Sequence, residues 1–252
     1  MTIDLERAVE EFWVTRGRCE YFPADYFDRL SLDEAYRIQL ALIDRRCAQG
    51  ERQIGWKVGL TSKAIQEQFG FHEPCFGCIL ETRPSGHVFA TGELIKPGFE
   101  TELCVRLDRP LAGEVSLDDV AAAVAVVHPS FEITETRGDP AQIALMLADN
   151  AQQRCVILGE PVALTPALRL DQVEARVELN GSVVATGVGA AVLDHPLNSV
   201  AWLARKLDEY GRRLRAGELV MTGSLVRQFP LAPGDRAWAS FSGIGAVEVR
   251  VG

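Results

Sequence analysis

The sequence predicts an α+β protein, in which a small helical N-terminal part precedes a mixed, strand-rich C-terminal part. Helix-capping residues and apolar residues at helical spacing gather in the first 80 residues. Several later segments instead alternate apolar and polar residues with a period of two, as strands do. We therefore expect a mainly helical region over residues 1–80 and a mixed-β domain over residues 81–252.

Residues 3–17 predict an amphipathic helix that opens the chain. Its apolar residues are expected to form one buried stripe. The stripe consists of Ile3, Leu5, Ala8, Phe12 and Val14. A second helix is expected to begin with the capping box at residues 31–34 (SLDE), to run to about Ala48 and to end near Gly50.

Residues 55–60 (GWKVGL) predict a short strand or an extended turn. Thr61 or Ser62 then caps a third expected helix, which stops near Gly70. Farther along, Asn180-Gly181 is a strong hairpin signal. The other expected elements are a strand over 99–107, a helix over 116–127, a strand over 173–179, a helix over 196–210 and two strands over 236–251.

The composition excludes several classes of protein. Hydrophobic residues make up 47% and charged residues 24% of the 252 residues, the balance of a globular protein rather than a disordered one. The formal net charge of −9 argues against binding to a nucleic-acid backbone, which needs a basic patch. No apolar run approaches the roughly 20 residues that span a bilayer, and the acidic N-terminus does not resemble a signal peptide. We therefore expect a cytoplasmic protein without nucleic-acid or membrane partners, with its six cysteines as free thiols.

Glu100 and Glu102 stand out within residues 91–150, a segment with eleven acidic and four basic side chains. On a strand the two glutamates project from the same face, while their alternate neighbours point largely into a core. Neighbouring carboxylates repel and raise each other's pKa, so the pair needs either solvent or a cation. A solvated sheet edge is one explanation. The other is a hard divalent ion, Mg²⁺ or Mn²⁺, with Glu132 as a third oxygen ligand.

Lys57 lies between Trp56 and Val58, inside an apolar run with glycines at positions 55 and 59. A lysine in this setting either extends to the surface or is held near a negative centre, and its neighbours in the sequence do not decide between the two. Near a metal-bound carboxylate substrate, the lysine could stabilise a developing enolate or move a proton.

Seven segments occur in an order that is specific for one family, although no single motif is strong. Together they resemble the 2-keto-4-pentenoate hydratase and 4-oxalocrotonate decarboxylase family of the fumarylacetoacetate hydrolase superfamily, from about Ser31 to Val251. The segments are GWKVGLTSKAIQEQFG, IKPGFETELCVRL, HPSFEITETRG, LADNAQQ, LDHPLNSVAWLARKL, GELVMTGSL and PGDRAWASFSGIGAVEV.

The resemblance implies that the C-terminal, catalytic domain is the mixed β-sandwich roll of the fumarylacetoacetate hydrolase type. It places the family's ligands for Mg²⁺ or Mn²⁺ on Glu100, Glu102 and Glu132, and the family's active-site lysine on Lys57. It also implies a set of substrate-binding residues. This set is Val58, Leu60, Cys75, Phe76, Gln152, Thr222 and Ser224.

The resemblance also implies an activity. Family members act on 2-hydroxydienoic or 2-oxo acids from the meta-cleavage of aromatic rings, and they are usually homo-oligomers. The expected function is a metal-dependent hydratase that adds water to the conjugated alkene of such a small molecule. The alternatives are a decarboxylase of a 2-oxo dioic acid, a carbon–carbon bond hydrolase, and an inactive subunit that pairs with a pathway hydratase or decarboxylase.

The chain departs from the family pattern at two positions. Many hydratases carry an aspartate where Cys75 stands and a serine where Gln152 stands. An aspartate can shuttle a proton and hold a water molecule, so the proton-transfer groups are expected to differ while the metal ligands are kept. Nearby, Arg137 is expected to pair either with Glu135 or with a substrate carboxylate, and Asp149 either to bridge structure near the site or to contact substrate.

Overall fold

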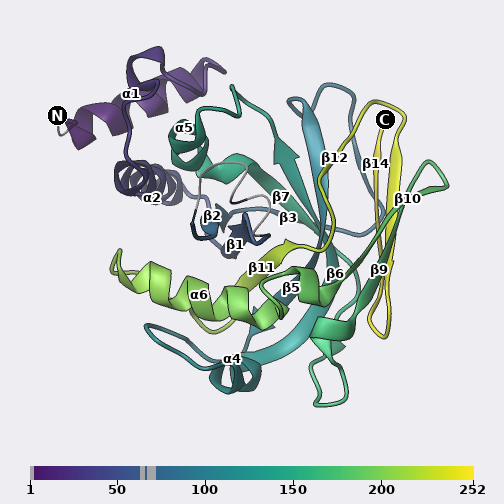
Figure 1. Cartoon of the computed structure of the whole chain (residues 1–252). Coiled ribbons are helices and arrows are strands. Elements are labelled where there is room, and N and C mark those ends of the chain that lie inside the picture. Colours follow the sequence, from purple (N-terminus) through teal and green to yellow (C-terminus); the bar gives the residue numbers. More distant parts are fainter. Residues whose placement is uncertain (1–2, 63–65, 67–71) are drawn as a thin grey trace.

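Two β-sheets and several helices make up the fold, shown in Figure 1 as a computed structural model that describes residues 3–62, 66 and 72–252. The helices are α1 (Leu5–Gly17), η1 (Ala24–Tyr26), α2 (Leu32–Ala48), α4 (Leu117–Ala123), α5 (Ile143–Ala148), η2 (Asn150–Gln152), η3 (Leu170–Gln172), η4 (Gly189–Ala191) and α6 (Pro196–Asp208). The strands are β1 (Gly55–Gly59), β2 (Cys75–Ile79), β3 (Thr82–Pro84), β4 (His87–Phe89), β5 (Pro97–Leu107), β6 (Val124–Glu135), β7 (Gln153–Leu158), β8 (Val162–Ala163), β9 (Glu174–Leu179), β10 (Ser182–Val188), β11 (Leu219–Ser224), β12 (Phe229–Pro230), β13 (Arg236–Phe241) and β14 (Gly245–Val251).

The larger sheet has the strand order β2-β1-β11-β5-β6-β7-β3, with β12 beside β5 and β8 beside β6. It curls, because β2 at one end of this order also contacts β7 near the other end. The smaller sheet has the order β10-β9-β13-β14-β4, and its β14 packs against β6 and β7. Helices α1 and α2 lie on the opposite side of the larger sheet from β9, β10 and β14 (Figure 1). The predicted α+β class is confirmed.

The N-terminal helices form largely where the sequence predicts them. At the start of α2, the Ser31 hydroxyl accepts a hydrogen bond from the Glu34 N–H at 3.2 Å, and the Glu34 carboxylate accepts one from the Ser31 N–H at 2.9 Å. This capping box is confirmed. In α1, Ala8 and Phe12 are buried as predicted, but Val14 is 39% exposed and the prediction for it is wrong. Two residues beyond Phe12, Val14 is rotated by about 200° around the helix.

The strand over residues 55–60 is confirmed as β1, which pairs with β2 and β11 in the larger sheet. The helix predicted from Thr61 or Ser62 to Gly70 falls outside the described residues. In the part of the chain that is described, no helix has the length and apolar character needed to cross a membrane. All six cysteines are free thiols, as predicted.

The helix predicted over residues 116–127 is too long. Helix α4 ends at Ala123, and β6 begins at Val124 and continues to Glu135. The residues at the changeover are mostly valines, whose branched side chains favour strands, and they pair with the last residues of β5. The rest of β6 continues this pairing along the whole of β5. Glu132 therefore lies within a long central strand.

The remaining predicted elements are confirmed as β5, β9, α6, β13 and β14. The hairpin between β9 and β10 turns at Asn180 and Gly181, which have φ angles of 54° and 79°. Positive φ at both central residues is the turn geometry that the Asn-Gly pair favours.

Candidate metal centre and active site

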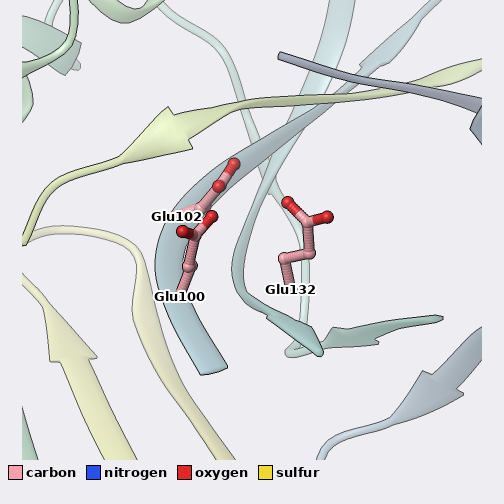
Figure 2. Close-up of side chains that lie close together, drawn as sticks. All are labelled: Glu100, Glu102 and Glu132. Carbon is pink, nitrogen blue, oxygen red and sulfur yellow. The ribbon is translucent and has the colours of Figure 1, made fainter. Parts of the chain in front are cut away.

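Three glutamates converge on the inner face of the curled sheet from two neighbouring strands (Figure 2). Glu100 and Glu102 project from the same face of β5, and Glu132 on β6 lies directly opposite Glu100. One carboxylate oxygen from each residue lies within 4.8 Å of those of the other two. Strand register thus brings together the three residues that the sequence analysis selected as metal ligands.

Within the described residues, these carboxylates have fewer hydrogen-bond partners than buried acids need. Glu102 and Glu132 have no exposed surface, and Glu100 is half-buried. The backbone N–H of Gly223 donates to Glu102 Oε2 at 2.8 Å, but no residue in the described ranges donates a hydrogen bond to Glu102 Oε1 or to either oxygen of Glu132. Such burial does not fit a solvated sheet edge. A hard divalent cation would supply the missing partner, because Mg²⁺ and Mn²⁺ prefer carboxylate oxygens.

Burial and mutual repulsion raise the pKa values of the buried glutamates in the cluster. Burial, followed by the charges of Glu132 and Glu100, raises the pKa of Glu102 well above its usual range. Burial also raises the pKa of Glu132 to about 7, although the nearby ammonium of Lys57 opposes the shift. The ionised cluster is therefore unfavourable until a cation binds to it.

We expect the metal-free protein to lose stability as the pH rises from about 5 to 8. A carboxyl group with a raised folded-state pKa has no unfavourable effect below its unfolded value of about 4.3. It destabilises the fold increasingly as the pH rises from that value to its folded value, and by a constant amount at higher pH. For Glu132 that folded value is about 7. Thermal unfolding midpoints measured in EDTA and in Mg²⁺ should diverge as the pH rises. A gap between them that stays constant from pH 5 to 8 would contradict the expectation.

Lys57 belongs to the same buried cluster. It lies on β1 opposite Gly77 of β2, is 5% exposed, and places Nζ 3.3 Å from Glu132 Oε1. Burial alone would lower the pKa of Lys57, but the surrounding negative charges, that of Glu132 foremost, outweigh burial and raise it. The sequence left two environments open for this lysine. The structure shows that Lys57 is held near a negative centre and does not extend to the surface.

Two glycines make room for this cluster. A Cβ atom at Gly77 would lie 3.3 Å from Lys57 Cε and 3.0 Å from the carbonyl oxygen of Asn150. Gly223 has a φ of +113°, and a Cβ atom there would lie 2.5 Å from the side chain of Thr61. The pairing of β11 with β5 is irregular at this point, where the Gly223 N–H reaches Glu102. Neither position tolerates a larger side chain without displacing the site.

An apolar floor lies beyond the cluster on the same face of the sheet. Cys104 follows Glu102 on that face of β5, and Met221 pairs with both Cys104 and Lys57. Both are fully buried, in a cluster separate from the main core. Because this floor keeps water out, interactions between the charges above it are less screened than at the surface.

A cavity of about 630 Å³ opens onto Lys57 and Glu100. Four of the predicted substrate-binding residues line it, namely Leu60, Cys75, Gln152 and Ser224. The other three, Val58, Phe76 and Thr222, do not. Each lies next to a residue that faces the site, and alternate residues of a strand face opposite sides. Val58 and Phe76 are buried in the main core, and the Thr222 hydroxyl donates to the carbonyl of Leu103 at 2.9 Å.

The two departures from the family pattern both lie at the cavity. Burial raises the pKa of the Cys75 thiol to about 11, so the thiol is neutral at pH 7 and cannot replace a carboxylate base. Gln152 ends a left-handed turn in which Asn150, Ala151 and Gln152 have φ angles of 63°, 50° and 64°. Three successive non-glycine residues in this region are strained, so other contacts must hold them there.

Those contacts come from buried polar side chains on both sides of the turn. The Asn150 side chain accepts from the Cys78 N–H at 2.7 Å and donates to the Cys78 carbonyl at 2.9 Å. Arg137 ion-pairs with Asp149 and Glu135, and Arg16 of α1 also donates to Asp149, at 2.9 Å. Arg137 thus pairs with Glu135, which is one of the two alternatives that the sequence predicted. Asp149 links Arg137 to Arg16 of α1 beside the site. The turn could not be predicted from the sequence, because its segment contains no glycine.

We expect the Asp149→Ala substitution to lower the free energy of unfolding by about 3–5 kcal/mol, since it leaves the buried Arg137 without its main partner. Urea unfolding followed by circular dichroism measures the change. Arg7→Ala is the matched control, because it removes an ion pair with Glu11 that lies in solvent, and it should lower the free energy of unfolding far less than Asp149→Ala does. Similar losses in the two variants would contradict a supporting role for Asp149.

Comparison with known proteins adds independent findings. The sequence pattern described as fumarylacetoacetate (FAA) hydrolase C-terminal matches residues 82–252. A 4-oxalocrotonate decarboxylase from Pseudomonas putida is 36% identical over 229 residues, which cover 89% of this chain and 87% of the relative. A 2-keto-4-pentenoate hydratase from Paraburkholderia xenovorans (strain LB400) is 36% identical over 231 residues, which cover 90% of this chain and 86% of the relative.

The fold comparison agrees with the sequence comparison. The structure of 4-oxalocrotonate decarboxylase from Pseudomonas putida G7, complexed with magnesium and adipate, superposes with a TM-score of 0.86 at 33% identity. The match covers 98% of this chain and 95% of that chain. The β-sandwich roll implied by the resemblance is confirmed. The relatives are a hydratase and a decarboxylase, and the solved decarboxylase contains magnesium.

Proposed function

Because the chain belongs to the fumarylacetoacetate hydrolase family, we propose that it is a divalent-metal-dependent lyase that acts on a 2-hydroxydienoic or 2-oxo acid. We place the hydratase reaction first, in which water is added to the conjugated alkene. The observation that carries the proposal is the buried glutamate cluster with unsatisfied carboxylate oxygens beside Lys57, at the end of a cavity.

Glu100, Glu102 and Glu132 would hold Mg²⁺ or Mn²⁺, which when bound supplies a Lewis acid for the C1 carboxylate and C2 oxygen of the substrate. Lys57 is protonated and lines the cavity, so it can stabilise negative charge on the C2 oxygen and donate a proton there. Gln152 and Ser224 offer neutral amide and hydroxyl groups at the cavity wall, where they can hold the water that adds to the alkene.

Decarboxylation of a 2-oxo dioic acid is the second candidate. The described residues that line the cavity include no histidine, and no carboxylate besides Glu100. Cys75 is neutral at pH 7. Loss of CO₂ needs the same stabilisation of an enolate but no activated water, so this lining is also compatible with that reaction. Hydrolysis of a carbon–carbon bond, which usually needs a histidine and a glutamate to activate water, receives no support from the described lining.

Two assays test the proposal. The absorbance of 2-hydroxypenta-2,4-dienoate and of 2-oxo-3-hexenedioate is followed with Mg²⁺ or with EDTA, while released CO₂ is measured. We expect metal-dependent loss of the dienoate without CO₂; CO₂ from the dioate would favour the second candidate. Calorimetry should show that oxalate, which mimics the enolate, binds only in the presence of Mg²⁺. Absence of both turnover and oxalate binding would contradict the proposal.

The expectations of a homo-oligomer, a pathway partner and a cytoplasmic location stay predictions, as does the boundary between residues 80 and 81. Light scattering of the purified protein measures the number of subunits, and co-purification from the host tests for a partner enzyme.

A further inference from the structure

A second cavity, here called the rear pocket, lies at the end of the curled sheet remote from the metal site. It has a volume of about 720 Å³. Glu102, Cys104 and Arg106 are alternate residues of β5 and share one face of the strand. Glu102 belongs to the metal site, Cys104 to the apolar floor, and Arg106 lines the rear pocket. Four residues of strand span about 13 Å, so the floor lies between the two cavities.

The other residues at the floor agree with this placement. Leu219 belongs to the floor, Ile54 and Leu158 pack against it, and all three line the rear pocket. Ser62, the last residue before an undescribed segment, lines the cavity on the metal side, at the opposite end of β1 from Ile54. The rear pocket is therefore separate from the cavity that contains the candidate active site.

The acidic side chains that line the rear pocket in the described ranges already have partners. Asp44 forms an ion pair with Arg212 at 2.5 Å. Glu51 forms one with Arg46 at 2.6 Å. Glu218 is half-buried and accepts two hydrogen bonds, one from a side chain and one from the backbone. Asp44 and Glu51 are thus neutralised by arginines of their own.

Three further arginines line the rear pocket, namely Arg52, Arg106 and Arg215. Their guanidinium groups form no ion pair with an acidic side chain of the described residues, and Glu218 offsets only part of their charge. A guanidinium group presents several N–H donors in one plane, which match the oxygens of a carboxylate or a phosphate. This part of the lining therefore favours a small oxyanion.

His128 adds an independent feature to the rear pocket. It lies on β6 opposite Cys104, is 9% exposed and lines the pocket. Its Nδ1 donates to the Gly159 carbonyl at 2.9 Å, so Nε2 carries no proton while the ring is neutral. Burial foremost, together with the charge of Arg106, lowers the pKa of His128, and the ring is neutral at pH 8. Among the described residues, none bonds to Nε2, which leaves a hydrogen-bond acceptor at the pocket beside the guanidinium donors.

We propose that the rear pocket is a second binding site, which takes a small oxyanion that also carries an O–H group. The arginines bind the charged oxygens, and His128 Nε2 accepts the hydrogen bond from the O–H. An anion without this O–H would place an oxygen lone pair against Nε2 and leave the acceptor unpaired. Hydrogen phosphate and a hydroxycarboxylate both have the required chemistry.

Two matched pairs of anions test the proposal at pH 8. Hydrogen phosphate and sulfate have the same charge, as do malate and succinate, and within each pair the first anion has the additional O–H. Calorimetry on the protein freed of divalent metal should show at least about tenfold tighter binding of the first anion in at least one pair. The pair that shows the preference identifies the ligand as a phosphate or a hydroxycarboxylate. Equal binding within both pairs, or no binding, would overturn the inference.

Variants assign the binding to the rear pocket. Arg106→Gln should weaken binding of the preferred anion by at least about tenfold, as expected for the loss of a charged hydrogen bond. Arg205→Gln removes the same charge from an exposed position on α6 outside the pocket, and Glu102→Gln changes the metal site; both should bind the anion as the wild type does. Unchanged binding in Arg106→Gln would overturn the inference.

His128→Phe keeps a ring of similar size but removes the acceptor, so phosphate and sulfate, or malate and succinate, should then bind equally. A folded His128→Phe protein that keeps the wild-type preference would contradict the role of Nε2. If this variant fails to fold, the wild-type pairs and Arg106→Gln, at an exposed position, still decide. None of these measurements depends on turnover, so their outcome is independent of the proposed function.

Discussion

Replacing Glu102 with glutamine should weaken Mg²⁺ binding by at least about 100-fold, since the loss of groups that merely support metal ligands already costs about 10–100-fold. Turnover at a fixed, subsaturating Mg²⁺ concentration should fall accordingly. Glutamine keeps the oxygen that accepts from the Gly223 N–H, so the local backbone is expected to stay in place. Calorimetric titration of Mg²⁺ measures the change.

The same substitution should stabilise the metal-free protein. Glu102 is fully buried, and its neighbours in the cluster carry charge of the same sign. Glutamine removes the free-energy cost of burying this titratable group beside the other carboxylates, and we expect a gain of at least about 1 kcal/mol, or roughly 2–4 °C in the unfolding midpoint for a chain of this size. Loss of metal affinity together with a gain in metal-free stability is the signature of a site built for a cation.

Two further substitutions sharpen the comparison. Glu132→Gln should also weaken Mg²⁺ binding, but it removes the ion-pair partner of Lys57 and should not stabilise the metal-free protein. Glu160→Gln changes an exposed glutamate outside the cluster and should alter neither quantity. Unchanged Mg²⁺ affinity in both Glu102→Gln and Glu132→Gln would refute the metal site.

The second large effect is expected from Lys57→Met, which should lower kcat by about 10²–10⁴-fold, the range typical for a group that transfers a proton in the transition state. Methionine is close in length to lysine and carries no charge, so it can occupy the same buried space. Mg²⁺ affinity should stay the same or increase, because a positive charge 3.3 Å from Glu132 is removed. Steady-state kinetics at saturating Mg²⁺ and calorimetry measure the two quantities.

Lys206→Met serves as the matched control for Lys57→Met. Lys206 is also a largely buried lysine with acidic partners, Glu73 and Glu209, but it lies on α6 and does not line the cavity. Its replacement should leave kcat within about twofold of the wild type, since only groups that act in the transition state change the rate of the chemical step. Full turnover by a folded Lys57→Met protein would show that the lysine has no part in the chemistry.

Local sequence patterns were enough for the elements that depend on nearby residues. The capping box before α2, the Asn180-Gly181 hairpin and the alternation along β5 each depend on contacts within a few positions. Helix α4 shows the limit of such patterns: the valines after Ala123 pair with β5, and this distant partner decides where the helix stops.

The same distinction holds for the site. The sequence by itself determined that Glu100 and Glu102 share a strand face, because that spacing is local. It also made Glu132 and Lys57 candidates, and the resemblance assigned their roles. Only the tertiary structure decided that these four side chains meet in a buried place, since this requires the register of β5 with β6 and the approach of β1 and β2.

The outline of the cavity was likewise decided by the tertiary structure. Val58, Phe76 and Thr222 stand next to residues that face the site but are turned away from the cavity, whereas α5 brings Ile143 and Met146 to the cavity lining from outside the sheet. The left-handed turn that carries Gln152 depends on Arg137, Asn150 and their partners. A sequence pattern specifies which residues share a face, but long-range packing determines what that face contacts.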